Sequence, residues 1–180
     1  TFGNLVRHVK EISDMKSLAA WTNEQFDPRL SWADVDWVRE RWGGKFILKG
    51  IMEVEDALLA VQHGADAIVV SNHGGRQLDG APSSIRALPA IVDAVGSQTE
   101  VWMDGGIRSG QDVLKAWALG ARGTLIGRAM AYGLGAMGEA GVTRALEILH
   151  KELDVTMAFC GHTQIKNVGR GILRPGTFTS

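Results

Sequence analysis

Residues 71–79, Ser-Asn-His-Gly-Gly-Arg-Gln-Leu-Asp, carry the side chains of this chain that are best suited to chemistry. His73 can exchange a proton near neutral pH, and Arg76 can bind a carboxylate through two parallel hydrogen bonds. Gly74 and Gly75 allow the backbone to turn sharply and to come close to a ligand. The segment therefore predicts a site for a small organic acid, although in isolation it also fits a capped loop with a surface arginine.

Apolar runs typical of strands alternate with helical patterns around this segment. The run that ends at Ser71 is short and β-branched, which predicts a strand buried on both faces of a parallel sheet. Glycines follow two of the helical patterns, at Gly64 and Gly120, where a left-handed cap is expected. The alternation predicts strands at 46–50, 67–71, 101–104 and 123–127, and helices at 54–63, 85–95 and 111–119.

Four successive βα units fit either a doubly wound sheet or part of a (β/α)8 barrel. A Gly-x-Gly-x-x-Gly dinucleotide motif is absent. Residues 104–108, Asp-Gly-Gly-Ile-Arg, and 127–128, Gly-Arg, follow the last two predicted strands, where barrels often bind phosphate. The sequence thus favours the last four βα units of a barrel, the C-terminal half, because a whole barrel takes about 250 residues.

This half-barrel is expected at residues 45–168, between a lead-in segment of helix and loop at 1–44 and an irregular tail at 169–180. Three tryptophans of the lead-in recur near helical spacing and are expected to pack before the first strand: Trp32, Trp37 and Trp42. The first residue is threonine with no signal-peptide pattern after it, so we expect a truncated or processed start.

The composition excludes several classes of function. The 180 residues have a formal net charge of -1 and 45% hydrophobic content, which gives no broad field for nucleic acid or anionic lipid. The single cysteine, Cys160, excludes an internal disulfide. No apolar run is long enough to span a bilayer, and no metal is expected, because four histidines lack acidic or cysteine partners at ligand spacing: His8, His63, His150 and His162.

Four motifs together, Lys49-Gly50 and the segments 71–79, 104–108 and 127–128, closely resemble the FMN-dependent 2-hydroxy acid dehydrogenases and oxidases. The resemblance extends from about residue 25 to about residue 166. Residues 23–28, with Trp32 and Trp37, are most similar to the bacterial L-lactate and mandelate dehydrogenase branch, and glycolate oxidase is another relative.

The resemblance implies FMN as cofactor and assigns a role to each motif. His73 would be the active-site base and would contact the substrate, Arg76 would bind the substrate carboxylate, and Lys49 would place positive charge beside the flavin. Ser71 would hydrogen-bond the flavin ring. The ribityl chain and phosphate would be held by Asp104, Gly105, Gly106, Ile107, Arg108, Gly127 and Arg128. A ribityl hydroxyl or a nearby arginine is expected to bind the carboxylate oxygens of Asp104.

The implied reaction is oxidation of an L-2-hydroxy acid of the lactate, mandelate or glycolate type to the 2-oxo acid. Electrons would then pass from the flavin to oxygen, a quinone or a cytochrome. The expected partners are the N-terminal half of the barrel, which would supply further site residues, and other copies of the chain, in the cytoplasm or at the periphery of the inner membrane. Two alternatives stay open: another FMN barrel, such as an isomerase or a dehydrogenase of purine metabolism, and an inactive half-barrel.

Overall fold

The computed structural model describes residues 14–25 and 27–176. These residues belong to two compact units, one extending to Arg41 and the other beginning at Trp42. The first unit holds helix α1 (Met15–Glu24) and nearly all of helix α2 (Trp32–Trp42).

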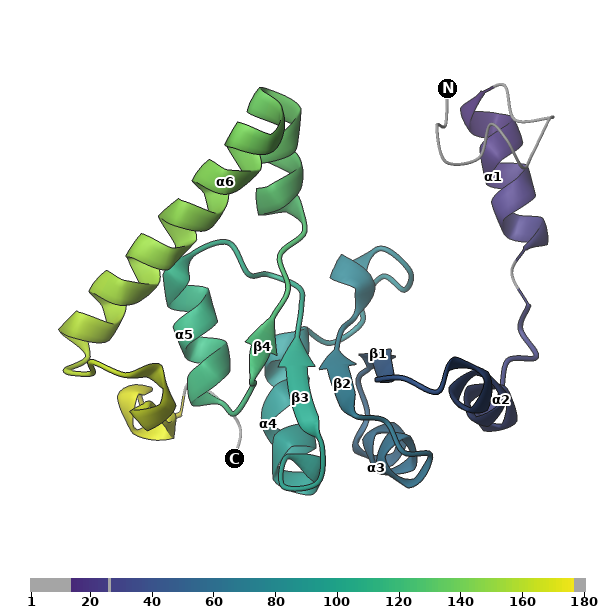
Figure 1. Ribbon diagram of the computed structural model, residues 1–180, viewed down its shortest axis with the longest axis horizontal. Helices are drawn as coiled ribbons and strands as arrows, with labels where there is room; N and C mark the ends of the chain where they lie inside the picture. The colour runs from purple at the N-terminus through teal and green to yellow at the C-terminus, as the bar shows by residue number, and fades with distance from the viewer. Residues whose placement is uncertain (1–13, 26, 177–180) are drawn as a thin grey trace. The chain divides into compact units, whose positions relative to one another are not determined.

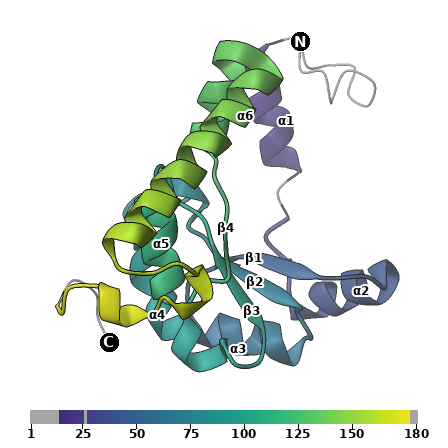
Figure 2. The ribbon, with the colours of Figure 1, turned by 60° about the vertical axis from the view of Figure 1, so that its left-hand side comes forward.

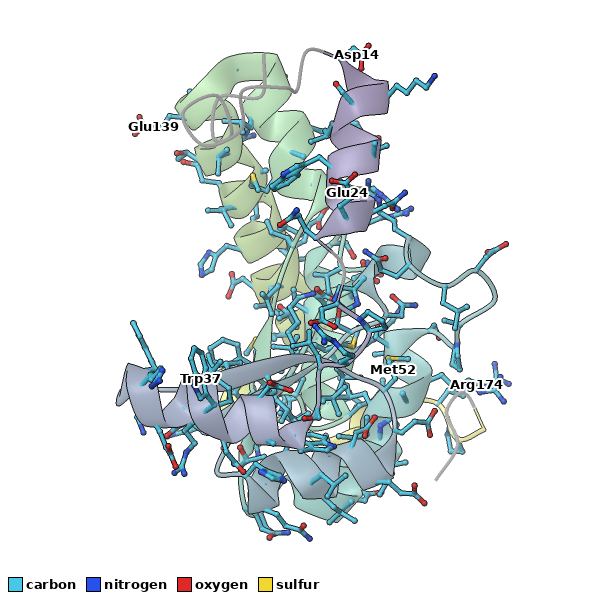
Figure 3. The ribbon with its side chains drawn as sticks, turned by 90° about the vertical axis from the view of Figure 1, so that its right-hand side faces the viewer. Asp14, Glu24, Trp37, Met52, Glu139 and Arg174 are labelled. Carbon is cyan, nitrogen blue, oxygen red and sulfur yellow. The ribbon has the colours of Figure 1, made fainter. Side chains whose placement is uncertain are left out.

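The first unit is stabilised by local contacts. Asp14 and Ser17 form a capping box at the start of α1, in which the Asp14 carboxylate accepts the Ser17 N–H at 2.7 Å. Helix α2 confirms the helix expected from the tryptophan spacing. The expected packing of these tryptophans is wrong for Trp37 and Trp42, which are 55% and 66% exposed. Trp37, labelled in Figure 3, instead stacks with Arg41, whose guanidinium carbon lies 4.2 Å from the centroid of the Trp37 ring.

The second unit is built on a four-stranded parallel sheet whose strand order follows the chain (Figure 1). The strands are β1 (Ile47–Ile51), β2 (Ala67–Val70), β3 (Glu100–Met103) and β4 (Gly123–Thr124). In register, Val69 lies opposite both Lys49 of β1 and Trp102 of β3. Because all four strands run in the same direction, their carboxyl ends lie along one edge of the sheet.

A helix connects each strand to the next. Helices α3 (Val54–Gln62), α4 (Ser84–Val95) and α5 (Gly110–Ala118) lie on one face of the sheet (Figures 1 and 2). Gly64 and Gly120 have φ angles of 74° and 108°, which confirms the predicted left-handed caps. Apolar side chains of the strands and of α4 form the buried core: Ile68, Val69, Val70, Leu88, Ile91, Val95, Val101 and Met103.

Strand β4 is shorter than the predicted 123–127. Pairing continues only as far as Leu125, whose N–H donates to the carbonyl of Met103 at 2.9 Å. The chain then leaves the sheet and enters helix α6 (Arg128–Phe159), which was not predicted from the sequence.

Helix α6 contains a reversal of the chain that divides it into two arms. Met137 and Gly138 have non-helical backbone angles, and Glu139, labelled in Figure 3, begins the second arm. The backbones of the two arms touch where Gly133 faces Gly141, since a Cβ on either glycine would collide with the other residue's carbonyl. The long second arm packs along α5 (Figure 2).

The chain beyond α6 returns to α5 through two 3-10 turns, η2 (Ile165–Asn167) and η3 (Arg170–Ile172). Val168 is buried against Leu114 of α5, with Ile172 packed beside them. Arg170 forms an ion pair of 2.6 Å with Asp93 at the end of α4. The described part of the segment expected as an irregular tail therefore packs on the helices.

Within the described ranges, no helix has the length and hydropathy that crossing a bilayer requires.

Candidate active site

Lys49 of β1 and the loops that follow β2, β3 and β4 line a cavity of about 820 Å³ at the carboxyl edge of the sheet. Pockets for small molecules and cofactors are commonly about 300–1,000 Å³. The cavity is lined by ten of the residues predicted from the sequence: Lys49, His73, Arg76, Asp104, Gly105, Gly106, Ile107, Arg108, Gly127 and Arg128. Segments as far apart in sequence as β1 and α6 therefore contribute to one site.

Ser71, the remaining predicted residue, lies beneath this lining and is only 1% exposed. Its hydroxyl oxygen accepts two hydrogen bonds, from the Lys49 ammonium at 3.0 Å and from the His73 backbone N–H at 3.1 Å. Ser71 thereby connects the loop after β2 to the cation of β1.

Lys49 and Asp104 form an ion pair across the sheet, with 2.8 Å between Nζ and Oδ2. The expected partner of Asp104 was an arginine or a ligand hydroxyl, and the partner is a lysine two strands away. The second carboxylate oxygen of Asp104, Oδ1, is buried and has no hydrogen-bond partner among the described residues. A buried acceptor of this kind normally has a donor, so Oδ1 is suited to a ligand hydroxyl.

His73 has a left-handed backbone, with a φ of 55°, and begins the short 3-10 turn η1 (His73–Gly75). This conformation is uncommon outside glycine, although histidine is among the residues that tolerate it best. The imidazole lies against the backbone of Gly50, where an added Cβ would come within 2.9 Å of Cε1. The histidine is thus presented at the cavity by an unusual backbone and a close contact.

Two residues near His73 received no role from the sequence. Gly50 lies at an irregularity in the pairing of β1 with β2 and has a φ of 104°. A glycine inside a strand pattern is a known sign of such a bulge or of a close approach, and this sign was available in the sequence. Asn72 precedes η1, and its side chain accepts the N–H of Gly74 at 3.0 Å. Asparagine before a turn is the corresponding sign.

Three guanidinium groups line the cavity, those of Arg76, Arg108 and Arg128, and none of them forms an ion pair with a described residue. Arg128 is the first residue of α6. The N-cap residue is Gly127, so no side chain caps the first backbone N–H groups of this helix. Unpaired guanidinium groups beside the backbone N–H groups of a helix N-terminus favour an anion. The cavity therefore combines one carboxylate with cations in excess, which suits an anionic ligand that also carries hydroxyls.

The model of the family described as FMN-dependent dehydrogenase matches residues 3–175. The chain belongs to this family. The four parallel strands with their connecting helices superpose closely on solved structures of related enzymes, which confirms the predicted partial (β/α)8 barrel. In the part of the chain that the structure describes, no three histidine, cysteine or acidic side chains are grouped as metal ligands.

Curated relatives within the FMN-dependent dehydrogenases support the same assignment. The L-lactate dehydrogenase of Caulobacter vibrioides (strain NA1000 / CB15N) is 50% identical over 171 residues, which cover 95% of this chain and 45% of the relative. The L-lactate dehydrogenase of Pseudomonas syringae pv. syringae (strain B728a) is 49% identical over the same shares of the two chains. The chain thus spans about half the length of the curated relatives it matches.

Solved structures resemble this FMN-dependent dehydrogenase chain closely. A monotopic membrane protein, (S)-mandelate dehydrogenase, has a TM-score of 0.84 at 38% identity, covering 94% of this chain and 47% of that one. A mandelate oxidase has a TM-score of 0.80 at 47% identity, covering 85% and 44%.

Proposed function

We propose that this chain forms the FMN-binding half of an enzyme that oxidises an L-2-hydroxy acid to the 2-oxo acid. The observation that carries the proposal is the convergence of His73, Arg76 and Lys49 on one cavity. The remaining wall of that cavity is built from residues 104–108 and 127–128, which suit a phosphate and a polyol chain. The family supplies the cofactor class.

The residues of the cavity fit FMN in two respects. The buried oxygen Oδ1 of Asp104 can accept a hydrogen bond from a ribityl hydroxyl, which would give it the partner it lacks. Arg108 and Arg128, with the free N-terminus of α6, can bind the phosphate. A Cβ at Gly106 would meet no atom within 4 Å, so the loop leaves space there for a ligand. Ser71 would donate its hydroxyl proton to the flavin ring.

In the proposed reaction Arg76 binds the substrate carboxylate through its planar fork and fixes the α-carbon in place. His73 takes one proton from the substrate onto an imidazole nitrogen. Bound FMN would accept the two electrons and the second proton, so that the C–H and O–H bonds are exchanged for a carbonyl. Lys49 supplies positive charge on the flavin side of the cavity.

We further propose the partners that this chemistry needs. Four further βα units, the N-terminal half of the barrel, would close the cavity and complete the site, and other copies of the chain would assemble with it. Oxygen, a quinone or a cytochrome would take the electrons from reduced flavin. The protein would work in the cytoplasm or at the periphery of the inner membrane, and the similarity to a monotopic membrane protein supports peripheral association with a membrane.

Anaerobic addition of lactate or mandelate to the FMN-loaded, full-length protein tests the proposal. The yellow flavin colour should bleach, and His73→Asn should retain the colour while abolishing the bleaching. Arg76→Lys should weaken catalysis by at least about 1–3 kcal/mol, because a point charge replaces a two-pronged donor. Colour without bleaching would indicate another FMN barrel, and a protein that never binds FMN would indicate a non-catalytic half-barrel.

A further inference from the structure

The imidazole of His73 makes no hydrogen bond to any described side chain or backbone group, so its direction depends on its own backbone and on its contact with Gly50. That backbone is left-handed, and Gly74 and Gly75 continue the left-handed run with φ angles of 70° and 69°. Among the described residues, His73 is the only one other than glycine with a positive φ. A conformation this uncommon persists only where neighbouring groups hold it.

Asn72 supplies most of the hydrogen bonds that hold this turn. Its side-chain oxygen accepts the N–H of Gly74, and its side-chain amide donates to the carbonyl of Pro82, each at 3.0 Å. Its backbone carbonyl accepts the N–H of Gly75, also at 3.0 Å. The side-chain oxygen of Asn72 therefore holds the residue that follows His73. Its side-chain amide connects the turn to Pro82, at the far end of the same loop.

We propose that Asn72 is a positioning residue that acts through His73, an inference that rests on the proposed function of His73 as the base. By fixing the left-handed turn, Asn72 directs the imidazole of His73 against the backbone of Gly50. The contact is close, since a Cβ added to Gly50 would lie 2.9 Å from Cε1 of the imidazole, so the ring has little freedom to move toward Gly50. The Asn72 side chain binds backbone groups of the loop and contacts no reacting atom.

The direct test follows the ring of His73 by NMR in the full-length protein with isotopically labelled histidine. This chain contributes five histidines to the spectrum, and the His73 signal is assigned by its loss in His73→Asn. In Asn72→Ala we expect the His73 signal to move toward the position of a free histidine, while the other histidine signals stay in place. Asn167→Ala is the matched control, because it removes an amide from another 3-10 turn, and it should leave His73 unchanged.

Asn72→Asp separates the two side-chain bonds and serves if the alanine variant does not fold. Aspartate can still accept the N–H of Gly74 but cannot donate to the carbonyl of Pro82. We expect the His73 signal of this variant to lie between those of the parent and of Asn72→Ala. An unchanged His73 signal in both variants would overturn the proposal.

A kinetic arm distinguishes positioning from general damage. Flavin reduction by substrate should slow by up to about 100-fold in Asn72→Ala, since small misplacements of a catalytic group have effects of this size. The dissociation constant for FMN and the KM should change little. Equal losses of FMN affinity and of rate would refute a positioning role. If no variant, the parent included, oxidises hydroxy acids, the proposed function fails, while the NMR result still decides whether Asn72 orients His73.

Discussion

Replacing Lys49 by methionine should destabilise the flavin-free protein by leaving the Asp104 carboxylate without a partner. Methionine keeps most of the apolar stem of the lysine and removes only its charge and its donors. Lys49 is the one residue, among those that the structure describes, that binds the Asp104 carboxylate, through Oδ2 at 2.8 Å. Oδ1 is buried and already unpaired, so the variant would hold a carboxylate with no donor at all.

The magnitude follows from the exposure of the two side chains, which is 40% for Lys49 and 19% for Asp104. Exposed pairs contribute about 0–1 kcal/mol, whereas removing one partner of a fully buried pair costs about 3–5 kcal/mol. This pair lies between the two cases, so we expect a loss of about 1–3 kcal/mol in the free energy of unfolding.

Urea denaturation followed by circular dichroism measures this loss, with Lys45→Met as the matched control. Lys45 binds Asp66 at 2.6 Å on the surface, and Asp66 also accepts the backbone N–H of Phe46, so its carboxylate keeps a donor in the control variant. Lys45→Met should therefore unfold close to the parent. The double variant Lys49→Met/Asp104→Asn should recover much of the stability, because the stranded charge is gone. A Lys49→Met protein as stable as the Lys45→Met protein would contradict the role assigned to this ion pair.

Three further outcomes are expected in the same assay. Ser109→Ala should lose about 1 kcal/mol, because the Ser109 hydroxyl caps α5. Gly120→Ala should lose about 2 kcal/mol or more, since its φ is 108° and the new methyl group would collide with a valine of α4, whereas Gly161→Ala, with a φ of 76° and open space around it, should lose only about 1 kcal/mol. The hydrogen bond and charge of Asp66 raise the pKa of Lys45 above its ordinary value of 10.5, so the small stability difference between the parent and Lys45→Gln should be constant from neutral pH to about pH 10 and vanish as the pH rises through the raised pKa.

The alternation of strands and helices was predictable because its signals are local. The apolar runs and the capping glycines that follow the helices placed the elements of the sheet within about two residues, apart from the end of β4. Helix α6 was missed because glycines interrupt its first arm, and glycine disfavours helices. Gly133 of the first arm and Gly141 of the second allow the two backbones to touch, and no local pattern reveals such a contact.

The residues that line the cavity were predictable as a group, and the contacts among them were not. His73, Arg76 and the glycine-rich segments could be grouped because parallel strands bring their carboxyl ends together. The pair between Lys49 and Asp104 joins the ends of strands that are not neighbours in the sheet, so the sequence alone could not select lysine over arginine. The left-handed backbone of His73 depends in the same way on the contacts of a folded loop.

The backbone angle of His73 also restricts what evolution or a saturation library can place at this position. Every substitution is selected twice, first for tolerance of a positive φ and only then for acid–base chemistry. Asparagine, aspartate and glycine pass the first selection most easily, and β-branched residues fail it. Variants that keep the loop intact but lack an imidazole should therefore outnumber functional replacements. The residue frequencies at this position among folded variants would then reflect tolerance of a positive φ more than acid–base ability.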